Sequence, residues 1–300
     1  MRVRNFVSSS LIAALFAAVC VSSAFAQGAI YNSIPNPADG NYPSLGYEAT
    51  STSEFGDRLQ FAGTSRSVLS VTQTMSSWGC ESGGGVTCVT TPGSTFPHPI
   101  TLNIYAVGAG NAPGALLGTF TQTFNIPYRP SASASCPGGA WFDGTSCFNG
   151  YATDITFNTG GLVVPNEVIY GIAYNTTHHG YTPIGEAASC YTEDGKCGYD
   201  SLNVALTGAT TVGINPAPDD AYFATTYAPF YCDAGALGVG NFRLDAGCWT
   251  DFKPNVRFVA NTTPSNANAC KNGGWRFLTR ANGTTFRNQG DCIQYVNTGR

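Results

Sequence analysis

The sequence predicts an all-β protein, an antiparallel β-sandwich of jelly-roll kind. Apolar and polar residues alternate with a period of two over many short segments, which is typical of strands with one buried face. No window of about a dozen residues has a helical apolar period free of Gly and Pro. One apolar and one polar face per strand suits antiparallel sheets that are buried on a single side. We therefore expect two such sheets packed face to face, with a closed barrel as the alternative.

The clearest alternation lies in residues 100–105 and 168–174, where Ile, Leu, Val and Tyr occupy every second position. Asn111-Ala112-Pro113-Gly114 places Pro before Gly, as a type II turn requires. The strands expected from this pattern, in chain order, cover residues 69–72, 100–105, 119–126, 155–157, 168–174, 202–206 and 256–258.

Residues 1–26 are predicted to be a signal peptide. A basic start, Met1 to Arg4, precedes a short apolar segment, and Ala24-Phe25-Ala26 fits the small residues that precede a cleavage site. The apolar segment is short for a bilayer span and is interrupted by serines. We expect cleavage after Ala26, no transmembrane span in the mature chain, and a secreted, extracellular or cell-surface location.

The mature chain divides by composition into three parts. Residues 27–260 are expected to form the β-sandwich domain, and residues 261–269 (NTTPSNANA) a small polar linker. Residues 270–300 form a separate C-terminal element with two cysteines. Because this element is short and has few apolar residues, we expect it to fold independently but to require its disulfide.

Ten of the eleven cysteines lie beyond the signal peptide, and an even number in an exported chain predicts a disulfide framework. Their spacing favours bonds between neighbours, although sequence alone leaves other connectivities open. No pair of tight CxxC clips is present, which argues against a zinc site. The expected pairs are Cys80 with Cys88, Cys136 with Cys147, Cys190 with Cys197, Cys232 with Cys248, and Cys270 with Cys292.

Charge argues against two classes of partner. The mature chain keeps 12 Lys and Arg residues against 18 Asp and Glu residues, because Arg2 and Arg4 leave with the signal peptide. Nucleic acids and anionic lipid surfaces need clustered cations. We therefore expect no nucleic-acid partner, while the oligomeric state is left open.

All four tryptophans lie close to cysteines in the sequence. Trp78 precedes Cys80 by two residues, Trp141 lies between Cys136 and Cys147, and Trp249 follows Cys248. An indole ring can pack on a disulfide and hold a loop that has little core of its own. It can also be an exposed platform for a sugar ring, because loops at sandwich ends commonly carry binding sites. The three candidate ligand contacts are Trp78, Trp141 and Trp249, and the fourth ring, Trp275, follows Cys270 by five residues.

No catalytic motif is present, and no catalytic residue is assigned. The sequence lacks GxSxG, HExxH, a P-loop and a GxGxxG that follows a strand. His178-His179 is expected to be a loop pair, since adjacent side chains point to opposite sides of an extended chain. Asp219-Asp220 is a weak candidate for calcium, whose ligands are oxygens, although a solvated turn explains the pair equally well. No other cofactor is expected.

Two stretches resemble known sequences. The first runs from SLGYEATSTSEFGDRLQFAG through ITLNIYAVGAGNAPGALLGTFTQTFNIPYRP to GLVVPNEVIYGIAYNT. It resembles exported bacterial proteins with a jelly-roll-like β-sandwich and no established activity. The second, CKNGGW followed by FRNQGDCIQYVNTG, resembles a short two-cysteine motif at the C-terminus of diverse exported bacterial proteins. The resemblance implies a bacterial exported or surface protein, and it supplies no catalytic residues.

Two hypotheses follow for function. The first is a secreted or cell-surface module without enzymatic activity, which binds a glycan or another surface component. The alternative is a secreted hydrolase or lyase acting on polysaccharide, whose carboxylates are dispersed in the sequence. A glycosidase needs two carboxylates about 5–10 Å apart. A groove lined by two carboxylates and a tryptophan would favour the enzyme, and its absence would favour the module.

Overall fold

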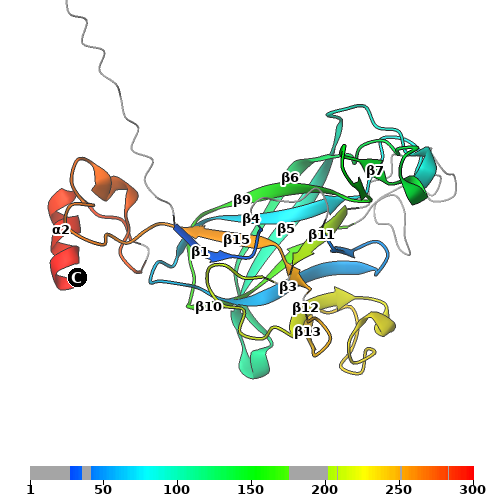
Figure 1. Cartoon of the computed structure of the whole chain (residues 1–300). Coiled ribbons are helices and arrows are strands. Elements are labelled where there is room, and N and C mark those ends of the chain that lie inside the picture. Colours follow the sequence, from blue (N-terminus) through cyan, green and yellow to red (C-terminus); the bar gives the residue numbers. More distant parts are fainter. Residues whose placement is uncertain (1–27, 36–41, 176–201, 208, 251, 283) are drawn as a thin grey trace, which may run out of the picture.

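The protein is an all-β sandwich of jelly-roll-like kind, built from antiparallel sheets (Figure 1). The computed structural model describes residues 28–35, 42–175, 202–207, 209–250, 252–282 and 284–300. The predicted signal peptide and His178-His179 lie outside these residues. Cys190 and Cys197 also lie outside them, so the bond expected between these two cysteines stays a prediction.

Seven strands form the first sheet, and every pairing in it is antiparallel. The central strand β4 pairs with β15, β9 and β11. The members of this sheet are β1 (Gly28–Asn32), β2 (Ser44–Gly46), β4 (Ser67–Ser77), β9 (Tyr151–Val163), β11 (Leu202–Thr207), β14 (Lys253–Pro254) and β15 (Val256–Ala260).

Six strands form the second sheet in the order β13-β12-β3-β10-β5-β6, and it too is antiparallel. Two further short strands, β7 and β8, pair with each other outside the sandwich sheets. The bounds are β3 (Thr52–Gln60), β5 (Thr95–Val107), β6 (Pro113–Pro127), β10 (Glu167–Ala173), β12 (Asp220–Thr225), β13 (Arg243–Ala246), β7 (Trp141–Phe142) and β8 (Cys147–Phe148).

Successive strands pass from one sheet to the other, which gives the fold its jelly-roll character. The chain leaves β3 for β4 in the opposite sheet, returns to β5 and β6, and crosses again to β9. Strand β6 also lies against β9 along one side of the molecule (Figure 1). The sheets therefore approach each other at this edge, without the closed barrel that was the alternative.

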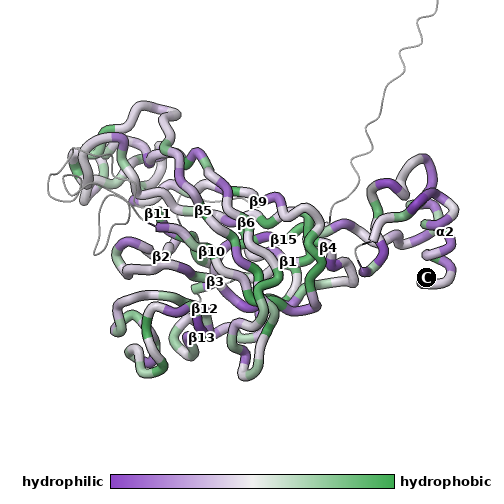
Figure 2. The backbone as a smooth tube through the Cα atoms, turned by 180° about the vertical axis from the view of Figure 1, so that it is seen from behind, coloured by the Kyte–Doolittle hydropathy of each residue, from purple (hydrophilic) through white to green (hydrophobic). Residues whose placement is uncertain are grey.

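The core lies between the two sheets and follows the period-two pattern of the sequence. Phe55 and Leu59 of β3 are fully buried, as are Leu102 of β5 and Ile172 of β10. Figure 2 shows the hydrophobic and hydrophilic positions along these strands. Each strand segment expected from this alternation lies within a strand of the structure, except that Tyr174 follows the last residue of β10.

The turn between β5 and β6 differs from the prediction. The sequence placed a type II turn at residues 111–114, whereas Pro113 already belongs to β6. The chain turns instead over residues 108–112, where Gly110 and Asn111 have φ of 65° and 63°. Gly and Asn adopt this left-handed conformation more readily than other residues, so the turn forms on them.

The C-terminal residues form a small lobe beside the sandwich (Figure 1). Its own hydrophobic cluster contains Leu278 and Phe286 around the Cys270–Cys292 disulfide. It also contains α2 (Gln289–Thr298), a helix that the sequence pattern did not predict. The helix begins where the Asn288 side chain accepts a hydrogen bond from the Asp291 amide, and it ends at Gly299 with φ of 73°.

Four of the five expected neighbour pairs are bonded in the described part of the chain. Each bond closes a loop that carries little hydrophobic core of its own. The bonded pairs are Cys80–Cys88, Cys136–Cys147, Cys232–Cys248 and Cys270–Cys292. Within the same described residues, no helix has the length and apolar character needed to cross a bilayer.

Candidate functional site

A cavity of about 500 Å³ opens among the stapled loops at one end of the sandwich. Tyr128, just after β6, and Tyr151, the first residue of β9, both line it, and both rings are half-buried. Its walls thus combine aromatic rings, proline rings and hydroxyl groups. The lining residues are Thr90, Pro92, Gly93, Ser94, Pro127, Tyr128, Pro130, Ser131 and Tyr151.

Trp141 supports this cavity from behind. Its side chain is only 6% exposed, and its ring meets Tyr151 edge to face with centroids 5.7 Å apart. The indole Nε1 donates to the Gly150 carbonyl at 2.9 Å. The predicted candidate contact Trp141 is therefore buried, because its ring fills the space behind the stapled β7–β8 loop. The ring that faces the cavity is Tyr151.

The second ring and the loops are held by buried contacts. Tyr128 packs on Phe96 with centroids 4.8 Å apart. Between the cavity residues Tyr128 and Pro130, the buried Arg129 donates to the Gly139 carbonyl at 2.8 Å and to the Gly85 carbonyl at 3.2 Å. One guanidinium thus ties the Cys80–Cys88 loop to the Cys136–Cys147 loop. The walls of the cavity are fixed before any ligand arrives, which reduces the entropy lost on binding.

The described lining of the cavity is uncharged. None of its nine described lining residues has a carboxyl group or an imidazole. The Ser94 hydroxyl and the Ser131 hydroxyl supply polar groups, and Ser131 Oγ already accepts from the Thr90 amide at 2.9 Å. Apolar and aromatic walls with a few hydroxyl groups suit binding of a small uncharged group.

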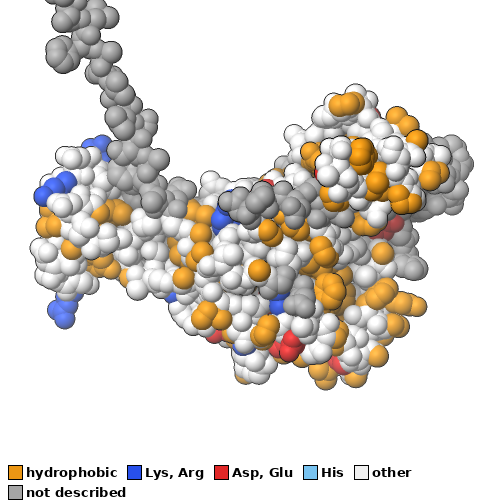
Figure 3. Space-filling view, viewed as in Figure 1, with side chains coloured by type: hydrophobic (Ala, Val, Ile, Leu, Met, Phe, Trp, Pro, Cys, Tyr) orange, Lys and Arg blue, Asp and Glu red, His pale blue; other side chains and the backbone are white. Residues whose placement is uncertain are grey.

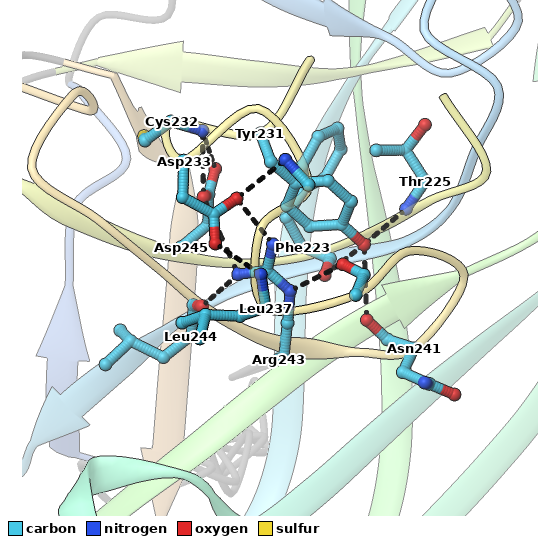
Figure 4. A network of polar contacts seen from close by, with 12 residues as sticks. Phe223, Thr225, Tyr231, Cys232, Asp233, Leu237, Asn241, Arg243, Leu244 and Asp245 are labelled. Carbon is cyan, nitrogen blue, oxygen red and sulfur yellow. Dashed lines mark hydrogen bonds and ion pairs between the residues drawn. The ribbon is translucent and has the colours of Figure 1, made fainter. Parts of the chain in front are cut away.

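The loop between β12 and β13 is tied by the Cys232–Cys248 disulfide to the segment that follows β13, and it is braced by a polar network (Figure 4). The Asp233 carboxylate accepts from the Gly235 and Leu237 amides and from Arg243 Nη2, the last at 2.8 Å. The Arg243 guanidinium also lies 3.9 Å from the centre of the Tyr231 ring. A cation over an aromatic face and a paired carboxylate both favour one conformation of the loop.

Trp249 belongs to the same network. Its indole Nε1 donates to Asp245 Oδ2 at 2.9 Å, and the ring packs on Phe55 and Phe223. The side chain is 9% exposed. The predicted candidate contact Trp249 therefore lies in the sandwich core. Trp78, directly after β4, is half-buried. Contact of any of the three rings with a ligand stays a prediction.

The braced loop presents apolar side chains to solvent. Leu237 is 78% exposed, and Tyr227 and Val239 are also exposed. Figure 3 shows hydrophobic side chains on this loop and on the stapled loops around β7. Exposed apolar groups on rigid loops are typical of contact surfaces.

Three described carboxyl groups have raised pKa values, and they lie in different places. Burial raises the pKa of Asp57 to about 7 and also raises the pKa of Glu54 and of Asp245. Glu54 and Asp57 are three residues apart on β3, so their side chains leave opposite faces of the sheet. Glu54 accepts from Asn103 Nδ2 and Tyr105 Oη, whereas Asp57 faces the core. They form no catalytic pair.

Of the weak calcium candidates, Asp219 lies in a turn and Asp220 is the first residue of β12. Asp219 Oδ1 accepts from the Thr250 hydroxyl at 2.6 Å, and the Asp219 carbonyl accepts from the Gly247 and Trp249 amides. Among the described residues, the one group of three metal-ligating side chains within reach of each other is Cys232, Asp245 and Cys248. Its two sulfurs are bonded to each other, so they are not available as thiolate ligands. Asp219 and Asp220 are not part of that group.

No protein-family model, curated protein or solved structure matches this chain. The chemistry of the cavity and of the molecular surface is therefore the basis for a function.

Proposed function

We propose that the protein is a secreted or cell-surface module without enzymatic activity that binds a glycan through the Tyr128–Tyr151 cavity. The disulfides support a location in an oxidising compartment outside the cytosol. The cavity offers flat aromatic and proline rings together with serine and threonine hydroxyls. Sugar rings have apolar faces and polar edges, so this lining complements an uncharged sugar.

The observation that carries the proposal is the chemistry of the lining. Two tyrosine rings lie on rigid supports, Tyr151 on the buried Trp141 and Tyr128 on Phe96. No carboxyl group lies among the nine described lining residues. The alternative, a hydrolase or lyase acting on polysaccharide, would need such groups at the place where the sugar binds.

The test is retention of the oxidised mature protein on insoluble polysaccharides and cell walls, with released sugars measured in the supernatant. Retention without release is expected. Release of reducing or unsaturated sugars would overturn the module and support the alternative. Retention on none of the polysaccharides would overturn glycan binding.

Two variants locate the binding site. Tyr151→Ala removes one cavity ring, and we expect affinity to fall about fivefold, since a stacked aromatic ring contributes on the order of 1 kcal/mol. Tyr227→Ala, at an exposed tyrosine of the braced loop, is the matched control and should bind as the wild type does. Equal loss in both variants would show that the cavity is not the binding site.

A further inference from the structure

The charges of the chain are divided unevenly between its two parts. Residues 270–300 contain five Lys and Arg residues and one acidic residue, Asp291. Residues 27–269 contain seven Lys and Arg residues against 17 Asp and Glu residues. The net negative charge of the mature chain as a whole therefore conceals a basic C-terminal lobe.

The one acidic side chain of the lobe is already engaged. Asp291 Oδ1 accepts from Arg280 Nη2 at 2.7 Å, and Oδ2 accepts from the Arg287 amide at 2.8 Å. These bonds hold the pKa of Asp291 below its ordinary value, and the bond from the Arg287 amide contributes most to the shift. The carboxylate is therefore ionised. Arg280 also lies over the rings of Phe286 and Tyr295. The Arg280–Asp291 pair is therefore a structural element of the lobe.

The remaining cations are on the surface. Lys271, Arg276, Arg287 and Arg300 are all exposed. Arg287 Nε lies 3.6 Å from Asp291 Oδ2, but the Arg287 side chain is 86% exposed and stays accessible to a ligand. Figure 3 shows blue side chains at separate margins of this lobe. Arg276 lies over the half-buried ring of Trp275, at 5.3 Å from the ring centre. An aromatic ring thus stands beside an exposed cation, an arrangement that suits an anionic ring-shaped group.

We propose that the C-terminal lobe binds an acidic polysaccharide, with Lys271, Arg276 and Arg287 contacting its anionic groups and Trp275 contacting a sugar ring. This site is separate from the cavity of the proposed function. The lobe would attach the protein to an anionic polymer while the acidic sandwich is held away from that polymer by repulsion.

The structure favours a polysaccharide over the other two common polyanions. The disulfide of the lobe is typical of an oxidising compartment such as the cell surface, where a polysaccharide is accessible to the protein. A membrane surface would favour exposed large hydrophobic side chains, and none of those found on the described surface lies in residues 270–300. Duplex DNA carries one charge per about 1.7 Å, so it would repel the sandwich, which has ten more acidic than basic residues, more strongly than a polysaccharide with one charge per sugar ring would.

The experiment uses the full oxidised mature chain and measures binding to polygalacturonate over a range of salt concentrations. Neutral dextran, duplex DNA and phosphatidylglycerol vesicles are the comparison ligands. We expect salt-dependent binding to polygalacturonate and none to dextran at this site. Tighter binding to DNA or to vesicles would overturn the polysaccharide assignment. If the protein bound no polyanion at low salt, the lobe would not be an anion-binding surface.

A charge-neutral variant, Lys271→Gln/Arg276→Gln/Arg287→Gln, should bind about tenfold more weakly at low salt. The slope of the logarithm of the binding constant against the logarithm of the salt concentration should be shallower by about 2, at ~0.7 for each lost contact. The charge-preserving variant Lys271→Arg/Arg276→Lys/Arg287→Lys should retain most of the binding and the slope. Unchanged binding in the neutral variant would contradict the proposal.

The two proposed sites can fail separately. Tyr151→Ala, designed for the cavity, should leave binding to polygalacturonate unchanged. Loss of polygalacturonate binding in Tyr151→Ala would place both activities in the cavity and overturn a separate site on the lobe.

Discussion

The sandwich and the C-terminal lobe are stabilised by different means. Among the described residues, the sandwich buries 32 side chains in one continuous cluster between its sheets. The lobe buries four, and two of these are the bonded cysteines Cys270 and Cys292. The hydrophobic effect scales with the apolar area removed from water, so a core of this size cannot offset the entropy of ordering some thirty residues. We therefore expect the lobe to depend on its disulfide and the sandwich to depend mainly on burial.

The larger core also tolerates a polar group that the lobe could not accommodate. Asp57 is 1% exposed inside the sandwich and accepts hydrogen bonds from the Arg58 amide and from Asn215 Nδ2. Buried Lys253 lowers the pKa of Asp57, but burial outweighs it and the pKa is about 7. A domain with many apolar contacts can carry the cost of a buried acid.

The largest expected effect is a pH dependence that comes from Asp57. Its folded-state pKa of about 7 is above the ordinary value of 3.8, so the folded state holds a proton that the unfolded state has lost between pH 4 and 7. The free energy of unfolding should therefore fall as pH rises through that window, by about 4 kcal/mol in total from this group. It should level off at higher pH. Thermal unfolding measured from pH 4 to 8 tests this, and Asp57→Asn should remove that part of the slope.

A second variant keeps this prediction testable if Asp57→Asn does not fold. Asn215→Ala removes the donor to Asp57 Oδ2, which should raise the pKa of Asp57 further and extend the falling part of the profile to higher pH. Parallel profiles for the wild type and both variants would show that Asp57 does not titrate in this window.

The next effect separates the two regions directly. Replacing Cys270 and Cys292 by Ser should unfold the lobe. The disulfide lowers the conformational entropy of the unfolded chain, which stabilises the folded lobe by roughly 3 kcal/mol. The sandwich should keep its melting temperature, since the two hydrophobic clusters are separate. Hydrogen exchange of residues 270–300 measures the first effect, and calorimetry measures the second.

The matched control is the same replacement at Cys80 and Cys88. That disulfide joins residues eight apart at the end of a long central strand, β4. We expect local loosening of the loop there, with exchange protection of β4 preserved. Persistent protection of the lobe without its disulfide would show that its small hydrophobic cluster is sufficient to hold it folded.

The sequence was most informative where burial repeats regularly. Period-two alternation predicted the central strands because their side chains face either a core or solvent, and neighbouring cysteines predicted four bonds that the structure contains. The fifth expected bond, between Cys190 and Cys197, falls outside the described residues. Helix α2 was not predicted, because it has too few apolar residues to give a helical apolar period. The Asn288 cap and Gly299 terminator were the available signals.

The cavity could not be found from sequence, because its residues meet only through the fold. Tyr128 follows β6 and Tyr151 begins β9, and these strands belong to different sheets. Two of the tryptophans that lie near cysteines in the sequence are packing residues in the structure. Trp141 packs on Tyr151, and Trp249 packs on Phe55. The basic lobe was visible in the sequence once the charges were counted separately for each part.

The smallest effect tests how closely the strands of the sandwich approach. Gly56 of β3 lies opposite Gly171 of β10, and a Cβ on Gly56 would overlap the Tyr170 carbonyl. Gly56→Ala should therefore force two central strands apart and cost about 2 kcal/mol in urea unfolding. Gly84→Ala, at an extended position with open space around it, should be neutral or slightly stabilising. Equal urea midpoints for the two variants would show that the close approach of β3 and β10 at Gly56 does not contribute to the stability of the sandwich.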